Sequence, residues 1–178
     1  MLFRSAHLRR NLLAAVACAR AVGVQPEGQV EYTPSAGRGQ RRVLPFGVTL
    51  IDDCYNANPM SMRAALEDLA EAGERDRHLR RVAVLGDMLE LGDTQREFHT
   101  RVGAEAQSAG VDVLVTVGPR AAAMSETFAG IVHRAADARE AARLLPALLR
   151  EGDVVLVKGS RAVGLELVCR ALRNGAST

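Results

Sequence analysis

From about residue 48 onward, short apolar runs alternate with longer stretches that have amphipathic, helical spacing. The apolar runs are rich in valine and other β-branched residues, which favour strands. The expected strands are Val48–Ile51, Val82–Leu85, Val111–Val117, Ile131–Val132 and Val154–Val157, and the expected helices lie near 60–73, 94–109, 120–129, 137–149 and 163–173. Regular alternation of this kind predicts an α/β fold with a doubly wound, mainly parallel sheet.

The strand pattern also indicates how the sheet is covered. The runs are almost continuously apolar, as expected for strands that helices bury on both faces. Val43–Leu44, separated from Val48–Ile51 by a Pro-Phe-Gly turn, is expected to add a hairpin at one edge.

The first 42 residues have a different pattern. Leu8–Val22 is rich in alanine and predicts a helix that ends at Gly23. Residues 25–42 combine Pro, Gly, Ser and Arg without an apolar period, so we expect a linker there. The predicted organisation is therefore a helical segment over 1–24, a linker over 25–42 and a domain over 43–178.

Composition excludes several classes of protein. The chain has 178 residues, 48% of them hydrophobic, and a formal net charge of +2, which gives no reason to expect nucleic acid as a partner. No apolar run approaches the roughly 20 residues of a membrane span, and no signal peptide opens the chain, so a cytoplasmic location is expected. The three cysteines are widely spaced, without a C-x-x-C pair, and the histidines lack metal-ligand spacing, so no metal site is predicted.

The basic residues are strongly skewed. Lysine and arginine total 23, and because Lys158 is the only lysine, 22 are arginine. A single lysine among so many arginines suggests a position that needs the compact ammonium group of lysine rather than the planar guanidinium group of arginine. A chance surface lysine is the alternative.

Polar residues follow four of the expected strands, where ligands of open α/β sheets bind. The segments are 52–59 (DDCYNANP), 86–92 (GDMLELG), 118–120 (GPR) and 158–161 (KGSR). The first offers carboxylates for ribose hydroxyls and carboxamides for a base edge, and the last offers cations for a carboxylate or phosphate. Turn formation and helix capping are the alternative role of these residues. The sequence contains neither G-x-x-x-x-G-K-[ST] nor a G-x-G-x-x-G after a strand.

Three strings occur in this order: D-D-C-Y-N-A-N-P-x-S-M-R, V-L-G-D-M-x-E-L-G followed by F-H-x-x-V-G, and L-V-K-G-S-R. Together they resemble the Mur ligase family, the ATP-dependent enzymes of peptidoglycan synthesis. The similarity is to the C-terminal part of members that join D-alanyl-D-alanine to UDP-N-acetylmuramoyl-tripeptide, and it covers about 170 residues.

The resemblance implies a Rossmann-like C-terminal domain, preceded by a helical remnant of a central ATPase domain. It also implies a reaction in which ATP phosphorylates a carboxylate and an amine attacks the acyl phosphate, with Mg²⁺ offsetting phosphate charge. By position, the resemblance implies ATP binding by Asn11, Arg38, Asp53, Tyr55 and Asn56, and binding on the dipeptide side by Asp87, Lys158, Ser160 and Arg161.

No complete catalytic set is present, so the chain is expected to be the C-terminal portion of a longer ligase and inactive alone. ATP and Mg²⁺ would then be held mainly by other regions of that ligase. Two alternatives remain: a stand-alone module that binds nucleotide or dipeptide, and the C-terminal domain of another Mur or folylpolyglutamate-type ligase.

Overall fold

The chain divides into two compact units, residues 1–34 and 35–178. The computed structural model describes residues 6–29, 33–75 and 79–175, so the first five residues of the predicted N-terminal segment and part of the predicted linker lie outside this description. Helix α1 (Ala6–Ala21) occupies the first unit, as predicted, and Gly23 follows it with φ +81°. No described helix has both the length and the apolar character needed to cross a membrane.

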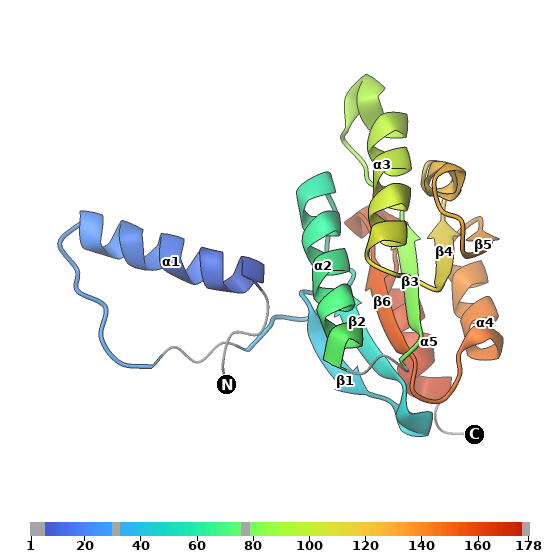
Figure 1. Ribbon diagram of the computed structural model, residues 1–178, viewed down its shortest axis with the longest axis horizontal. Helices are drawn as coiled ribbons and strands as arrows, with labels where there is room; N and C mark the ends of the chain where they lie inside the picture. Colours follow the sequence, from blue (N-terminus) through green and yellow to red (C-terminus); the bar gives the residue numbers. More distant parts are fainter. Residues whose placement is uncertain (1–5, 30–32, 76–78, 176–178) are drawn as a thin grey trace. The chain divides into compact units, whose positions relative to one another are not determined.

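The second unit contains the predicted sheet. Its strands are β1 (Gln40–Val43), β2 (Thr49–Asp53), β3 (Arg81–Gly86), β4 (Val113–Val117), β5 (Ile131–Ala135) and β6 (Val154–Lys158). They are arranged in the order β1-β2-β6-β3-β4-β5 (Figure 1). Only β1 is antiparallel, pairing with β2 as the predicted edge hairpin, and the other neighbours are parallel. The predicted mainly parallel α/β fold is confirmed.

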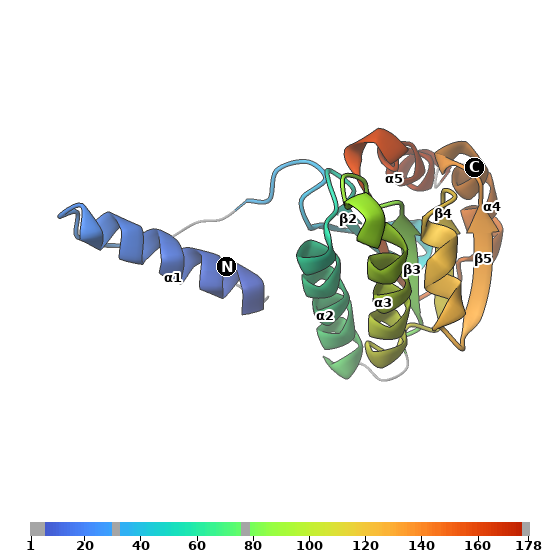
Figure 2. The same cartoon turned by 90° about the horizontal axis from the view of Figure 1, so that it is seen from above.

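Helices cover both faces of the sheet. Helices α2 (Pro59–Arg75) and α3 (Gln95–Ser108) lie on one face, and α4 (Ala138–Leu148) and α5 (Glu166–Asn174) lie on the other (Figure 2). Each face has its own buried apolar cluster. Alternation along the strands assigns side chains to the two faces, so Leu50 packs in the cluster beneath α4 and α5, whereas Ile51 packs beneath α2 and α3.

Three boundaries differ from the sequence-based expectations. The predicted linker 25–42 is too long, because Gly37 and Gly39, both at positive φ, turn the chain into β1, where Arg41 forms a 2.7 Å ion pair with Asp68. The segment expected as a helix near 120–129 forms only a 3₁₀ helix at Ala121–Glu126. Its backbone packs so closely on α3 that a Cβ at Gly103 would lie 1.9 Å from the carbonyl oxygen of Met124.

The third difference concerns the last helix, expected at 163–173. Residues Arg161–Val163 form a separate 3₁₀ turn, Gly164 follows at φ +75°, and α5 begins only at Glu166. This short turn after β6 places the K-G-S-R segment at the carboxyl edge of the sheet.

Candidate functional site

The sole lysine is buried at the carboxyl edge of the sheet. Lys158 and Asp53 are register partners at the ends of the parallel strands β6 and β2. The Nζ atom of Lys158 donates to Asp53 Oδ2 at 2.6 Å and to the carbonyl oxygen of Asn56 at 3.0 Å. The lysine side chain is only 3% exposed, whereas that of Asp53 is 22% exposed. Lys158 therefore orients the Asp53 carboxylate and the turn that follows it.

Two guanidinium groups lie against the ring of Tyr55. The Cζ atom of Arg38 lies 4.0 Å from the ring centroid, and that of Arg161 lies 5.1 Å from it. Tyr55 is anchored by its backbone, whose N–H donates to the carbonyl oxygen of Gly37 at 2.9 Å. All three side chains are exposed, so this edge presents an aromatic ring and two cations to solvent. Such a surface can stack against a flat ring and attract phosphate oxygens.

Asn56 and Asn58 complete the turn between β2 and α2. Asn56 Oδ1 accepts the N–H of Ala57 at 2.9 Å, and Asn58 Oδ1 accepts the N–H of Ser61 at 2.8 Å in the first turn of α2. Asn58 therefore has the capping role that was the alternative for these residues, whereas Asn56 is exposed at the edge, next to Tyr55.

Asp87 connects the ends of β3 and β4. Its Oδ1 accepts the N–H of Ala121 at 2.6 Å, and its Oδ2 lies 3.6 Å from a guanidinium nitrogen of Arg120. Gly118 allows this arrangement: its φ is +101°, and a Cβ there would lie 2.7 Å from the carboxyl carbon of Asp87. The side chain of Asp87 is 6% exposed, so the carboxylate is almost fully buried.

The loop after β3 is held by Ser160 and His99. Ser160 accepts the N–H of Leu89 on Oγ at 2.9 Å, and its own N–H donates to the carbonyl oxygen of Asp87 at 2.9 Å. His99 is fully buried, and its Nε2 lies 2.9 Å from the backbone nitrogen of Met88. Its Nδ1 lies 2.6 Å from the carbonyl oxygen of Gln95. These contacts require a neutral ring that carries its proton on Nδ1.

The chain is also similar to known proteins. Residues 37–161 match the protein family described as Mur ligase, glutamate ligase domain. The chain belongs to the Mur ligase family.

Individual members of the family are similar over almost the whole chain. The UDP-N-acetylmuramoyl-tripeptide–D-alanyl-D-alanine ligase of Mycobacterium tuberculosis is 37% identical over 93% of this chain. Among solved structures, MurF from Acinetobacter baumannii superposes with a TM-score of 0.81 at 31% identity over 96% of the chain. MurF from Thermotoga maritima in complex with ADP gives a TM-score of 0.74 at 28% identity over 93% of the chain. In each comparison the chain spans 38% of the relative's length.

Within the Mur ligase domain, eight of the nine site residues predicted from sequence lie at the carboxyl edge of the sheet or in the segments that pack against it. The contacts described above connect them as Asp53 with Lys158 and Asn56, Tyr55 with Arg38 and Arg161, and Asp87 with Ser160. The ninth, Asn11, lies on α1 in the first unit, and its part in nucleotide binding stays a prediction.

Sequence reasoning missed two residues of this edge. His99 was noted only as one of the histidines without metal-ligand spacing, and its contacts with Met88 and Gln95 were not foreseen. Arg120 follows Gly118-Pro119 at the end of β4 and lies beside Asp87, whereas only its segment had been noted. Its position directly after a strand was the available signal.

Proposed function

We propose that this chain supplies the C-terminal domain of an ATP-dependent ligase. The ligase joins D-alanyl-D-alanine to UDP-N-acetylmuramoyl-tripeptide through an acyl phosphate, in the cytoplasm, as a step of peptidoglycan precursor synthesis. The names of the relatives, which match over nearly the whole chain, support this choice of substrates.

The observation that carries the proposal is the grouping of Asp53, Tyr55 and Arg38 at one edge. A carboxylate held by a buried lysine can accept hydrogen bonds from two ribose hydroxyls, while the tyrosine ring and the exposed guanidinium group of Arg38 suit a base and phosphates. A relative solved in complex with ADP supports nucleotide binding by the ligase. Asn11, on the first unit, is assigned to adenine binding, as the family resemblance implies.

The residues assigned to the dipeptide side divide into two kinds. Arg161 is exposed, so it is assigned to direct contact with the dipeptide. Asp87, Ser160 and Lys158 are buried, and their polar atoms are engaged with the Ala121 N–H, with the loop after β3 and with Asp53. Their contribution is to hold those segments in place.

The chemical step itself needs groups that this chain does not contain. The sequence has no phosphate loop, and its only lysine is paired with Asp53. The carboxylates at the edge do not fit magnesium, which prefers several oxygen ligands, because Asp53 faces Lys158 and Asp87 faces Arg120. We therefore assign Mg²⁺ and phosphoryl transfer to other regions of the ligase, and expect no ATP turnover from residues 1–178 alone.

A chimera tests the proposal. Residues 35–178 would replace the matching part of the Escherichia coli relative, which is 36% identical over 177 residues. Phosphate release is expected only when ATP, UDP-N-acetylmuramoyl-tripeptide and D-alanyl-D-alanine are all present. Asp53→Ala should lower the rate about 10-fold or more, since a charge-assisted hydrogen bond is lost. Arg63→Ala, which removes an exposed side chain of α2, is the matched control.

Two outcomes contradict the proposal. A folded chimera that releases phosphate only with a different amine would indicate another Mur or folylpolyglutamate-type ligase. A folded chimera that binds nucleotide or dipeptide but releases no phosphate would indicate a binding module.

A further inference from the structure

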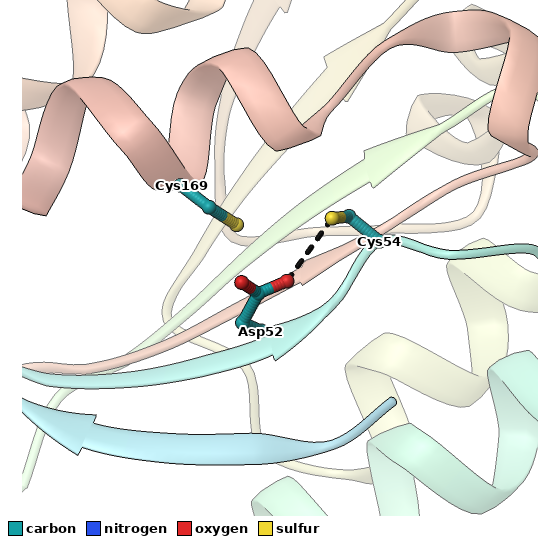
Figure 3. Close-up of side chains that lie close together, drawn as sticks. All are labelled: Asp52, Cys54 and Cys169. Carbon is teal, nitrogen blue, oxygen red and sulfur yellow. Dashed lines mark hydrogen bonds between the residues drawn. The ribbon is translucent and has the colours of Figure 1, made fainter. Parts of the chain in front are cut away.

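A second cluster of polar side chains lies at the end of β2, on the face opposite to Asp53. Asp52 lies in this strand, Cys54 follows its last residue, and Cys169 comes from α5, which packs over it (Figure 3). One oxygen of Asp52 and the two sulfur atoms all lie within 4.8 Å of one another, and all three residues are buried. Because side chains alternate along a strand, Asp52 faces α5 while Asp53 faces Lys158.

The contacts of this cluster give it a defined charge. The Cys54 thiol donates to Asp52 Oδ1 at 3.0 Å, and Arg173, one turn after Cys169 on α5, donates to Asp52 Oδ2 at 3.1 Å. The hydrogen bond with Cys54 and burial raise the pKa of the Cys169 thiol well above its ordinary value. With both thiols protonated, the Asp52 carboxylate and the Arg173 guanidinium balance each other.

We propose that Asp52, Cys54 and Cys169 form a binding site for a thiophilic divalent cation, of which zinc(II) is the representative. Cysteine sulfur and carboxylate oxygen are both zinc ligands, and three protein ligands leave the fourth tetrahedral position for a water molecule. At Zn–S distances of about 2.3 Å in tetrahedral geometry, the two sulfur atoms lie about 3.8 Å apart. The two sulfur atoms lie at most 4.8 Å apart, so binding requires them to approach each other by at most about 1 Å.

Charge favours the same occupant. On binding, Zn²⁺ forms two Zn–S bonds, both S–H bonds break, and two protons pass to solvent, with no change of oxidation state. The two thiolates neutralise the cation, so the buried cluster has no net charge before or after binding. Arg173 donates to Oδ2 of Asp52 and leaves Oδ1 with the Cys54 thiol, so the guanidinium group orients the carboxylate for a metal ion.

The site lies beside the proposed nucleotide edge and shares none of the residues assigned to the nucleotide. Cys54 lies between Asp53 and Tyr55 in the sequence, so a bound cation would link that turn to α5. The two cysteines are 115 positions apart (169 minus 54), and no spacing motif links them, which is why the sequence predicted no metal site.

Metal titration of the reduced 178-residue chain tests the proposal. The exposed Cys18 is first replaced by Ser to remove the remaining thiol. Zinc chloride is expected to bind at one equivalent, raise the melting temperature and release about two protons per metal, so that the affinity falls about 100-fold for each unit decrease in pH. Cobalt(II) in place of zinc should give the absorption of a cobalt–thiolate complex.

Variants locate the site. Cys54→Ser and Cys169→Ser should each abolish the cobalt–thiolate absorption, whereas the Cys18→Ser background retains it. A mapping experiment on the unaltered chain does not depend on whether the variants fold. Zinc should protect Cys54 and Cys169 from alkylation, as measured by mass spectrometry, and leave Cys18 reactive.

Three results overturn the proposal. In the first, zinc neither shifts the melting temperature nor protects either buried thiol. In the second, the Cys54→Ser and Cys169→Ser variants are folded and bind zinc as tightly as the background. In the third, a mild disulfide oxidant joins Cys54 to Cys169 while zinc has no effect, which makes the cysteines a redox pair instead.

Discussion

Lys158 and Asp53 end two neighbouring parallel strands and meet in an ion pair of 2.6 Å at the carboxyl edge of the sheet. By the family resemblance, Lys158 belongs to the dipeptide side and Asp53 to the nucleotide side, so the pair joins the two sides. Since Lys158 also donates to the carbonyl oxygen of Asn56, a single ammonium group fixes both the carboxylate and the turn after β2. The buried lysine is therefore a supporting residue of the site.

Replacing Lys158 by Met should destabilise the domain. The substitution keeps the apolar stem but removes the ammonium group that Asp53 and the Asn56 carbonyl accept from, and we expect a loss of about 2 kcal/mol in the free energy of unfolding. Lys158→Arg should also be destabilising, because the larger, planar guanidinium group does not fit a position that is 2% exposed. Urea denaturation followed by circular dichroism measures both effects.

An exposed ion pair of the same domain is the control. Arg63 and Glu67 on α2 are separated by one turn, with side chains 67% and 53% exposed, so Arg63→Ala should cost only a few tenths of a kcal/mol. The double variant Asp53→Asn, Lys158→Met should be more stable than the sum of the two single changes implies. Strict additivity would argue against direct coupling of the pair.

Much of this edge could be predicted because its signals are local. The valine-rich runs identified the strands, and the rule that ligands bind beyond the carboxyl ends of the strands pointed to the residues after β2, β3 and β6. Lys158 stood out by composition alone, as the only lysine among 23 basic residues. These inferences needed no knowledge of distant contacts.

Other features depended on contacts that no local pattern encodes. Asp52, Cys54 and Cys169 come together only because α5 packs over β2. The 3₁₀ helix at Ala121–Glu126 has an alanine-rich sequence that favours an α-helix, but its close packing on Gly103 overrides that propensity. Likewise, the imidazole of His99 meets Met88 only after α3 has docked.

His99→Ala should loosen the loop after β3. The change leaves the Met88 N–H without its acceptor and opens a cavity at a fully buried position, so we expect a cost of about 2–3 kcal/mol. Amide hydrogen exchange at Met88 should become faster, while exchange in the middle of β3 changes only with global stability. His133→Ala on β5, where the side chain is half-buried, should have a small effect on both measurements. Unchanged exchange at Met88 would show that His99 does not anchor the loop.

The cap of α4 should make stability depend on pH. Asp137 accepts the N–H groups of Arg139 and Glu140, both at 2.8 Å, and these hydrogen bonds, that of Glu140 foremost, lower the pKa of its carboxyl group. A lowered pKa in the folded state means that the stabilisation is complete above the unfolded-state pKa of about 3.9 and is lost as the pH falls through the folded-state value.

The stability difference between the unaltered chain and Asp137→Ala should therefore be constant near neutral pH and shrink below about pH 4. Asp137→Asn separates capping from titration, since asparagine caps helices well but does not ionise. Its deficit relative to the unaltered chain should be small at pH 7 and should not grow on acidification. Urea denaturation midpoints measured at a series of pH values provide the comparison, and a deficit for Asp137→Ala that increases as the pH falls would contradict the assignment.

Glu90 in the loop after β3 has a backbone conformation that its side chain disfavours. Its φ is +63°, and among the described residues it is the only one other than glycine with a positive φ. A β-carbon in this left-handed region costs about 1–2 kcal/mol, of which the greater entropy of glycine in the unfolded chain offsets a part. Glu90→Gly should therefore raise stability by about 0.5–1 kcal/mol.

Gly92→Ala, at φ +59° in the same loop with no atom within 4 Å of the added carbon, should lower stability by a similar amount. Both changes lie on the loop that carries Asp87, and they should shift the melting temperature in opposite directions. Gly92→Ala alters no charge, so the pair separates the backbone effect from any loss of the Glu90 charge. If Glu90→Ala stabilised the chain as much as Glu90→Gly, the charge rather than the backbone would be the source of the effect.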